Sequence, residues 1–297
     1  MIVNTLAALS LIGIWPRFLE PSWLETSRLP IHLPQLPKAF EGFTCLHLSD
    51  LHFASKPSLV LRRTLQQAKK LKPDCILFTG DFLCYAQLHQ PEVLQQFLAE
   101  FKAPYGCFAV LGNHDYNSYV SLDSRGQSVV LDKKLSLLSR FKNHRSPSNL
   151  SGHTKLLELL QKTSFQLLHN ETIQITKAGS FLNIAGLGDF FARDVHLDKA
   201  FKNWIADFPG LVLCHNPVTA KLLEEYPGDL ILSGHTHGSQ FNIPLIRDLL
   251  LQDKRLRRGL IPIGHKKLFI SRGIGSHIHF RLFSRPEITL ITLHGQS

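Results

Sequence analysis

The stretch Leu48-Ser-Asp-Leu-His52 closes a short run of apolar and β-forming residues, 44–48, and sets a carboxylate two residues before an imidazole. Four further short motifs close apolar runs of their own. They are Thr79-Gly-Asp81, Gly112-Asn-His-Asp115, Cys214-His-Asn-Pro217 and Gly234-His-Thr-His-Gly238. Carboxylate, amide and imidazole groups have no packing role at the ends of buried strands, whereas a hydrolytic centre with two metal ions requires such groups.

The apolar runs that precede these motifs predict the buried strands of an α/β protein. They cover residues 44–48, 75–79, 108–111, 211–214 and 230–232, and helical patterns separate them. Ligand sites in open α/β sheets lie beyond the carboxyl ends of strands, and all five motifs occupy that position. Because residues i and i+2 of a strand face the same side, we expect Asp50 and His52 to point together, and likewise His235 and His237.

The motifs supply seven candidate metal ligands: Asp50, His52, Asp81, Asn113, His215, His235 and His237. Two carboxylates, one amide oxygen and four imidazoles make a mixed set that suits Mn, Fe, Co, Ni or Zn better than calcium. Seven ligands are too many for one ion, and they fit two ions if one carboxylate bridges them. Paired ions of this kind serve phosphoryl displacement, because they stabilise both the attacking and the leaving oxygens.

The ordered motifs resemble the pattern D-x-H, G-D, G-N-H-D/E, H, G-H-x-H of the calcineurin-like metallophosphoesterases, and the resemblance runs from about Gly42 to Leu293. It implies a four-layer α/β/β/α sandwich with an inserted helical cap. It also implies a metal-dependent phosphodiesterase or pyrophosphatase that uses two divalent ions, with Mn²⁺ as the expected metal.

The same resemblance implies a role for each motif residue. One ion would be held by Asp50, His52 and His237, and the other by Asn113, His215 and His235. Asp81 would bridge the two ions. His114 would bind no metal and would act as the acid that contacts the phosphoryl group or protonates the leaving oxygen.

The later motifs are similar to those of the membrane-associated bacterial phosphodiesterases within this family. They comprise residues 234–240, Ser271-Arg-Gly-Ile-Gly and Arg285-Pro-Glu-Ile-Thr-Leu, although Ser239 stands where that branch usually has glycine. Overall similarity favours the lipid A pathway enzymes that cleave UDP-2,3-diacylglucosamine to UMP and 2,3-diacylglucosamine 1-phosphate. Two alternatives remain: a soluble nucleotide or general phosphodiesterase, and a non-catalytic scaffold that keeps the fold. The intact ligands argue against the scaffold.

Composition and charge point to an anionic partner. The 297 residues suffice for one large core, and the formal net charge is +10. Basic residues cluster in 69–72, 133–145 and 254–267, without the interleaved aromatics of a base-stacking platform. We therefore expect an anionic membrane surface and a lipid or lipid-linked nucleotide substrate, with no nucleic acid and no obligate protein partner. The five cysteines form no C-x-x-C pair, which indicates free thiols in a reducing compartment.

Residues 1–40 are predicted to be an N-terminal apolar segment and a linker that precede a catalytic domain at 41–297. The apolar run 6–15 is shorter than the roughly 20 residues that span a bilayer. Trp15, Phe18 and Trp23 resemble an interfacial anchor, and the alternative is a terminal helix packed on the core. The prolines at 30, 34 and 37 favour an extended linker. We expect a protein peripheral on the cytoplasmic face of the inner membrane.

Residues 116–152 form an insert directly after His114. Within it, Leu131, Leu135, Leu138 and Phe141 recur at helical spacing, with Lys133, Lys134, Arg140 and Lys142 on other faces. This pattern predicts a basic amphipathic helix at the rim of the metal site, which could hold acyl chains and dock on anionic lipid. The alternative is a cap whose apolar stripe packs on the main domain.

Overall fold

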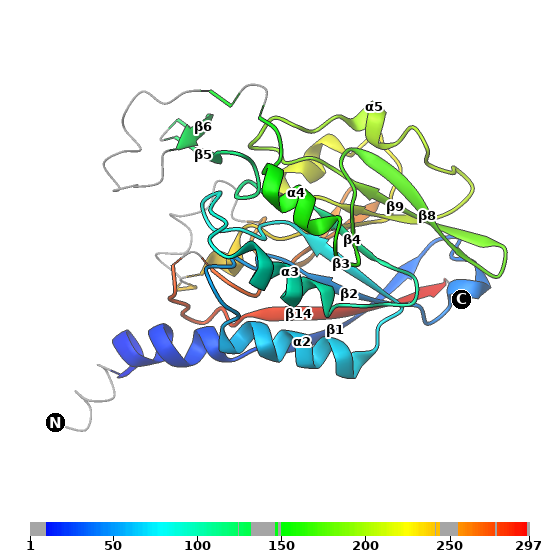
Figure 1. Ribbon diagram of the computed structural model, residues 1–297. Coiled ribbons are helices and arrows are strands. Elements are labelled where there is room, and N and C mark those ends of the chain that lie inside the picture. Colours follow the sequence, from blue (N-terminus) through cyan, green and yellow to red (C-terminus); the bar gives the residue numbers. More distant parts are fainter. Residues whose placement is uncertain are drawn as a thin grey trace.

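The computed structural model describes residues 10–123, 125–131, 146–147, 150–240, 242–243, 255–276 and 278–295. Within these residues, two six-stranded sheets pack face to face, and helices cover their outer faces (Figure 1). The four-layer α/β/β/α arrangement expected from the resemblance is therefore confirmed.

The first sheet has the order β1-β14-β2-β3-β4-β7. Its strands are β1 (Glu25–Leu33), β14 (Glu287–Gly295), β2 (Thr44–Leu48), β3 (Cys75–Thr79), β4 (Cys107–Val110) and β7 (Phe165–Leu167). Neighbouring strands are parallel except for the antiparallel pair β14–β2. Strands β2, β3 and β4 lie side by side, so their carboxyl ends meet at one edge of this sheet.

The second sheet has the order β12-β13-β11-β10-β9-β8. Its strands are β12 (Gly259–Ile263), β13 (Lys266–Ile270), β11 (Leu230–Ser233), β10 (Gly210–Leu213), β9 (Ser180–Gly186) and β8 (Glu171–Lys177). The four central strands are parallel, and the two outer strands pair antiparallel with their neighbours. The two remaining predicted motif strands, β10 and β11, are thus neighbours in this second sheet.

Three hydrophobic layers hold this arrangement together. Between the sheets, side chains such as Leu77 and Leu213 are fully buried. Outside the first sheet pack the helices α2 (Leu59–Leu71), α3 (Pro91–Ala99) and α4 (Thr154–Leu160). Outside the second sheet pack the short helix α5 (Leu197–Ala200) and the 3₁₀ helix η5 (Pro217–Leu222). Strands buried on both faces explain why the sequence shows continuous apolar runs rather than alternation.

The proline-rich segment is extended, as predicted, but it is not a linker. Residues Glu25–Leu33 form β1, which pairs along its whole length with β14 and buries Ile31 and Leu33. Pro30 is tolerated because β1 is an edge strand, where the missing N–H faces no partner strand. Two 3₁₀ turns, η2 (Glu20–Ser22) and η3 (Lys38–Phe40), flank this strand.

The N-terminal segment begins with a π-helical stretch, η1 (Ser10–Leu19), which extends away from the body of the molecule (Figure 1). Among the described residues, no helix is both long enough and apolar enough to cross a bilayer.

The insert is only partly described. It contains a hairpin of β5 (Tyr119–Leu122) and β6 (Ser128–Leu131), and an isolated bridge joins Tyr116 to Gly152 at its base. Leu131, predicted to start the helical stripe, is instead the last residue of β6 and is buried. The rest of that stripe, at 133–142, lies outside the described residues.

Candidate metal centre

All eight motif residues converge where five strands end. Strands β2, β3 and β4 of one sheet and β10 and β11 of the other reach the same edge, and each candidate side chain lies just beyond its strand. The imidazole of His215 crosses between the sheets, with Nδ1 2.7 Å from the carbonyl oxygen of Thr79 at the end of β3. The sandwich thus places together groups that are up to 187 residues apart in the sequence, between Asp50 and His237.

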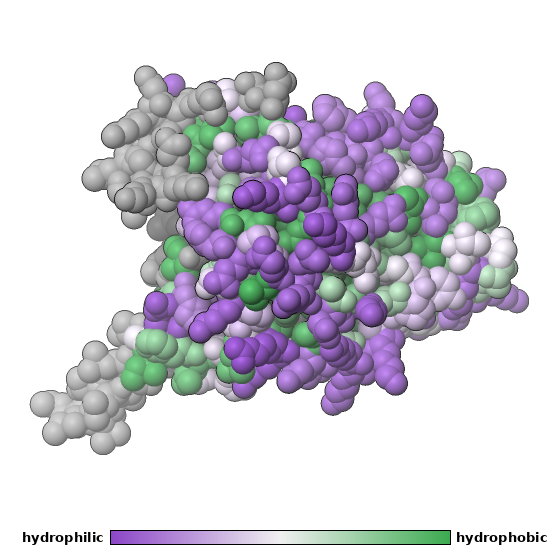
Figure 2. All heavy atoms as spheres, in the orientation of Figure 1, coloured by the Kyte–Doolittle hydropathy of each residue, from purple (hydrophilic) through white to green (hydrophobic). Residues whose placement is uncertain are grey.

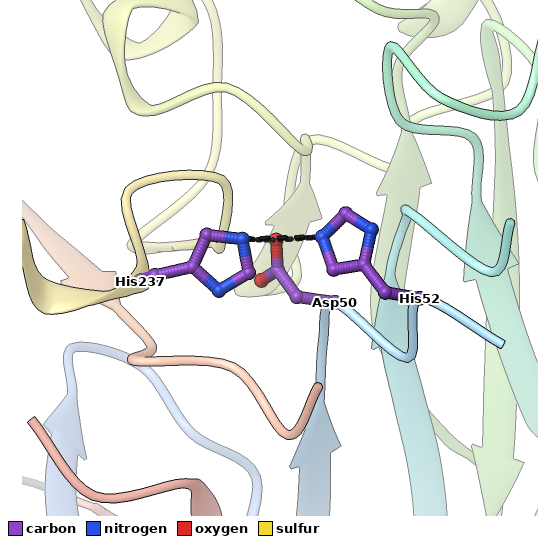
Figure 3. Close-up of side chains that lie close together, drawn as sticks. All are labelled: Asp50, His52 and His237. Carbon is purple, nitrogen blue, oxygen red and sulfur yellow. Dashed lines mark hydrogen bonds and ion pairs between the residues drawn. The ribbon is translucent and has the colours of Figure 1, made fainter. Parts of the chain in front are cut away.

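The first group of ligand-type atoms comes from Asp50, His52 and His237 (Figure 3). Asp50 Oδ1 lies 3.9 Å from His52 Nε2 and 3.6 Å from His237 Nε2. The two imidazole Nε2 atoms are 3.1 Å apart. Three buried lone-pair donors aimed at one point favour a cation among them, because imidazole and carboxylate are metal ligands with little reason to converge otherwise.

The second group comes from Asp81, His215 and His235, whose ligand-type atoms all lie within 4.8 Å of one another. Asp81 Oδ2 is 3.2 Å from His215 Nε2 and 3.5 Å from His52 Nε2, so this one oxygen faces both groups. Asn113 joins the second group, with Oδ1 3.0 Å from His235 Nδ1. Its amide nitrogen donates to the carbonyl oxygen of Val120, which turns the amide oxygen toward the centre.

Positive charge is strongly favoured beside Asp81. Burial acts to raise the pKa of this carboxyl, but the neighbouring histidines, led by His215 and His114, outweigh it and hold the pKa well below the usual range. For His215, burial acts to lower the pKa, yet Asp81 and Asp50 raise it to about 10. A buried anion stabilised by surrounding positive charge is the electrostatic setting that a divalent cation fits. The donor set and its geometry therefore suit metal ions.

Hydrogen bonds to the backbone distinguish His215 from His114. His215 Nδ1 faces a carbonyl oxygen, so in the neutral ring it carries the proton and leaves the Nε2 lone pair available to a metal. His114 Nδ1 accepts a hydrogen bond of 2.8 Å from the amide of Tyr85. In the neutral ring, His114 Nε2 then carries the proton, although His114 also shares a cluster of ligand-type atoms with His52 and Asp81.

Two aromatic rings flank His114. The ring centroids of Tyr119 and Tyr85 lie 4.3 Å and 5.2 Å from that of His114. Tyr119 belongs to strand β5 of the insert, and Tyr85 to the turn after β3. The insert therefore contributes directly to the wall beside His114, as its position in the sequence predicts.

The backbone of the centre is unusual, because five of the candidate ligands have positive φ. They are Asp50, His52, Asp81, His235 and His237, with φ between 44° and 70°. Only the surrounding packing can hold so many side-chain-bearing residues in the left-handed region. The expected pairing of His235 with His237 is consequently wrong. These residues lie beyond the strand, where alternation does not apply, and they face different groups.

Two glycines show how closely the loops of the metal centre pack against the candidate ligands. A Cβ on Gly112 would lie 2.2 Å from Asp81 Oδ1, and one on Gly234 would lie 2.3 Å from Asp50 Oδ2. Any side chain at either position would displace a candidate ligand, which accounts for glycine next to the motif residues.

Sequence reasoning passed over Asp115, although this residue closes the Gly-Asn-His-Asp motif. It is fully buried, and its Oδ2 accepts from the amides of Asp81, Phe82 and Gly112 at 2.7, 3.1 and 3.0 Å. Its Oδ1 accepts from the amide of Leu83 at 2.9 Å. Asp115 thus binds together the two loops that present Asp81 and the Asn113–His114 pair. The signal in the sequence was that Asp115 is an acidic residue inside this motif to which the family pattern gives no metal-binding role.

Replacing Asp115 with asparagine should lower the free energy of unfolding by about 2–3 kcal/mol, because an amide NH₂ would face backbone donors and leave at least one unsatisfied. Thermal or urea unfolding measures the loss. Asp123→Asn is the matched control, since its carboxylate accepts two amides in the exposed hairpin turn, and we expect less than about 1 kcal/mol there. Equal losses in both variants would contradict the role given to Asp115.

Arg281 is a second residue that the motifs did not reveal. It is 1% exposed and donates to the carbonyl oxygens of Arg272, Gly273 and Ser284, among others. Its Nη2 lies 3.4 Å from His237 Nδ1, on the side of the ring away from the first group. Burial lowers the pKa of Arg281 to about 10, and the charge of Asp50 opposes that shift. The guanidinium thus supports the loop that lies behind His237.

Comparison with known proteins places this geometry in a family. A model of the calcineurin-like phosphoesterase domain matches residues 43–239. The UDP-2,3-diacylglucosamine pyrophosphatase LpxG of Chlamydia muridarum is 37% identical over 313 residues, covering 96% of this chain and 94% of that protein. LpxG of Chlamydia trachomatis is also 37% identical, covering 98% and 95%. The phosphodiesterase YaeI of Escherichia coli is 29% identical, covering 97% and 95%. The chain therefore belongs to the calcineurin-like phosphoesterase family and is a metal-dependent hydrolase.

Proposed function

We propose that this protein hydrolyses the pyrophosphate bond of a membrane lipid linked to a nucleotide, and that its substrate is UDP-2,3-diacylglucosamine. The products would be UMP and 2,3-diacylglucosamine 1-phosphate, a step of lipid A biosynthesis. The observation that carries the proposal is the likeness to the two chlamydial pyrophosphatases, which covers nearly the whole of both chains and not only residues 43–239.

The geometry supports a centre with two metal ions. Asp50, His52 and His237 would hold one ion, and Asn113, His215 and His235 would hold the other. Asp81 would bridge them, because one of its oxygens faces histidines of both groups. The mixed nitrogen and oxygen set suits Mn²⁺. When bound, the ions would supply positive charge to the transferring phosphoryl group and an activated water.

The chain's own groups complete the chemistry. Hydrolysis adds a water oxygen to one phosphorus and breaks the bridging P–O bond, so the departing oxygen gains negative charge. His114 presents an Nε2–H at the edge of the centre, 3.8 Å from Asp81 Oδ2. There it would donate a hydrogen bond to a phosphoryl or leaving oxygen. Since the Tyr85 amide fixes the ring, this donor is oriented before substrate binds.

The five cysteines support a cytoplasmic location for the reaction. All five are free, and four of them are buried. Free thiols are typical of reducing compartments. We therefore propose that the protein works at the cytoplasmic face of the inner membrane, where a nucleotide-linked lipid would present its head group.

The decisive experiment compares four substrates for the Mn²⁺-loaded protein in mixed micelles: UDP-2,3-diacylglucosamine, its deacylated form UDP-glucosamine, a phospholipid and bis-p-nitrophenyl phosphate. We expect UMP release from the diacylated nucleotide, with kcat/KM at least about 100-fold above that of the deacylated form, a difference of about 2.7 kcal/mol. Parallel loading with Mg²⁺, Co²⁺ and Zn²⁺ identifies the metal that supports turnover.

Two results would overturn this assignment. Equal efficiency on the acylated and deacylated nucleotides, with no dependence on micelles, would make the protein a soluble nucleotide phosphodiesterase. Absence of turnover on every substrate, with both ions bound, would make it a scaffold that keeps the fold.

A further inference from the structure

Exposed hydrophobic side chains are concentrated at one place on the molecule. Among the described residues, nine large hydrophobic side chains are exposed, and six of them belong to two segments, residues 14–23 and 278–283. These six are Phe18 (62% exposed), Phe283 (60%), Ile14 (57%), Leu19 (50%), Ile278 (49%) and Trp23 (46%). Figure 2 shows hydrophobic residues gathered over the N-terminal helix at the lower left. We call these six side chains the apolar patch.

The two segments are packed against each other, so the patch is one surface. The amide of Arg281 donates to the carbonyl oxygen of Pro16 at 2.8 Å, and Arg17 donates to that of His279. Glu20 is 2% exposed and accepts from the amide of Ser284 at 2.6 Å. These contacts, of which that of Glu20 is buried, fix the N-terminal helix on the loop, whereas its apolar side chains Ile14, Phe18 and Leu19 are exposed.

Arginines border the patch, and two of the three carboxylates near it are buried, whereas the Glu25 side chain is 42% exposed and pairs with Arg272. The guanidinium of Arg285 lies 4.0 Å from the centroid of the Trp23 ring, and that of Arg17 lies 5.8 Å from the Phe18 ring. Arg258 donates to the carbonyl oxygen of Phe283. Glu20 and Glu287 are 2% and 6% exposed. Aromatic side chains next to arginines are typical of segments that lie in the headgroup region of a bilayer.

The loop that carries two of the six patch side chains also contacts residues of the metal centre. The amide of Gly275 donates to the carbonyl oxygen of Asp50, and Arg281 Nη2 lies 3.4 Å from His237 Nδ1. The patch therefore adjoins a loop that touches Asp50 and His237 from behind. This placement suits a substrate whose head group must reach the ions while its acyl chains stay in the bilayer.

We propose that the apolar patch docks the protein on an anionic lipid bilayer. Its apolar side chains would enter the acyl boundary, and Arg17, Arg258 and Arg285 would contact anionic head groups. A second copy of this chain fits the patch less well, because a symmetric contact would bring the same arginines face to face. The proposal deepens the proposed function, because it names the surface through which the protein reaches a lipid substrate. Only the biological purpose of the docking rests on the proposed function.

The test measures vesicle binding with no substrate present. In the triple variant Phe18→Ser, Ile278→Ser and Phe283→Ser, we expect the partition coefficient on vesicles of phosphatidylglycerol mixed with phosphatidylcholine to fall by about tenfold or more. The control carries Leu222→Ser and Leu260→Ser, two exposed leucines outside the patch, and should bind as the native protein does. Native binding should also weaken on pure phosphatidylcholine and with added salt, because salt screens exposed charges.

Turnover of bis-p-nitrophenyl phosphate and thermal unfolding show that the triple variant is folded, and we expect both to be unchanged. Vesicle binding within twofold of native in that variant would overturn the proposal. The proposal would also be overturned if the native protein were a dimer and the same substitutions dissociated it, since the patch would then join two copies. If the native protein binds anionic vesicles through the patch but does not hydrolyse UDP-2,3-diacylglucosamine, the proposed substrate fails and the docking surface stands.

Discussion

Replacing Asp81 with alanine should reduce turnover by about 10⁴-fold or more, equal to roughly 5 kcal/mol of transition-state stabilisation. One oxygen of Asp81 faces His52 in the first group and His215 in the second, which is the basis for proposing this residue as the bridge. Loss of the bridge should separate or release the ions, on which the charge stabilisation of the phosphoryl group depends. Turnover of bis-p-nitrophenyl phosphate and elemental analysis of the purified variant measure the two effects.

Asp81→Asn separates catalysis from folding. Asp81 Oδ1 accepts the amide of His114 at 3.0 Å, and asparagine retains an oxygen for that hydrogen bond while it removes the charge. We therefore expect Asp81→Asn to unfold at close to the native temperature and still to lose most of its metal and its activity. Two bound ions and a normal rate in either variant would rule out the bridging role.

Replacing His114 with alanine should lower the rate by about 10²–10⁴-fold, the range for a positioned acid or base, while the metal content stays at the native level. The physical reason is the hydrogen bond from the Tyr85 amide, which occupies Nδ1 and leaves a proton on Nε2 of the neutral ring. A nitrogen that carries a proton donates to an oxygen and cannot bind a metal. Elemental analysis and steady-state kinetics on the same samples test both parts.

Two comparisons sharpen the His114 experiment. His114→Gln retains an N–H donor of similar reach and should recover part of the rate lost in His114→Ala. Substrates with good leaving groups should lose less, because their leaving oxygen needs less stabilisation. If metal content falls in step with activity, His114 has to be reassigned as a ligand.

The candidate site was predictable from sequence because its information is local. Each motif closes a buried strand, and a strand buried on both faces must be apolar, so polar residues at its end stand out. Runs 44–48 and 75–79 match β2 and β3 residue for residue, and all eight motif residues meet at one edge of the sandwich. By contrast, the sequence patterns over residues 196–204 and 218–226 each predict a helix, and the structure has only the short helix Leu197–Ala200 and the 3₁₀ turn Pro217–Leu222 there. Short apolar runs are compatible with several local structures, and packing chooses among them.

Long-range contacts account for what sequence reasoning missed. The proline-spaced segment 25–33 has the local preference of a linker, but its partner β14 lies about 260 residues away and turns it into an edge strand. Asp115 accepts from the amide of Asp81 in another loop, and Arg281 lies beside the ring of His237, and no spacing in the chain records those contacts. The sequence also does not reveal which residues form the apolar patch, because residues 14–23 and 278–283 become one surface only after folding.

The amino-acid sequence by itself determined which residues are candidate ligands, since ligand chemistry depends on residue type and each motif is a few residues long. Only the tertiary structure decided the direction in which each of these side chains points beyond its strand. His235 and His237 face different groups, whereas Asp50 and His52, whose backbone is equally left-handed, face the same one, and the packing of two sheets sets His215 against Thr79. The directions of side chains in such loops depend on contacts from the whole fold, which outweigh the local preference of the chain.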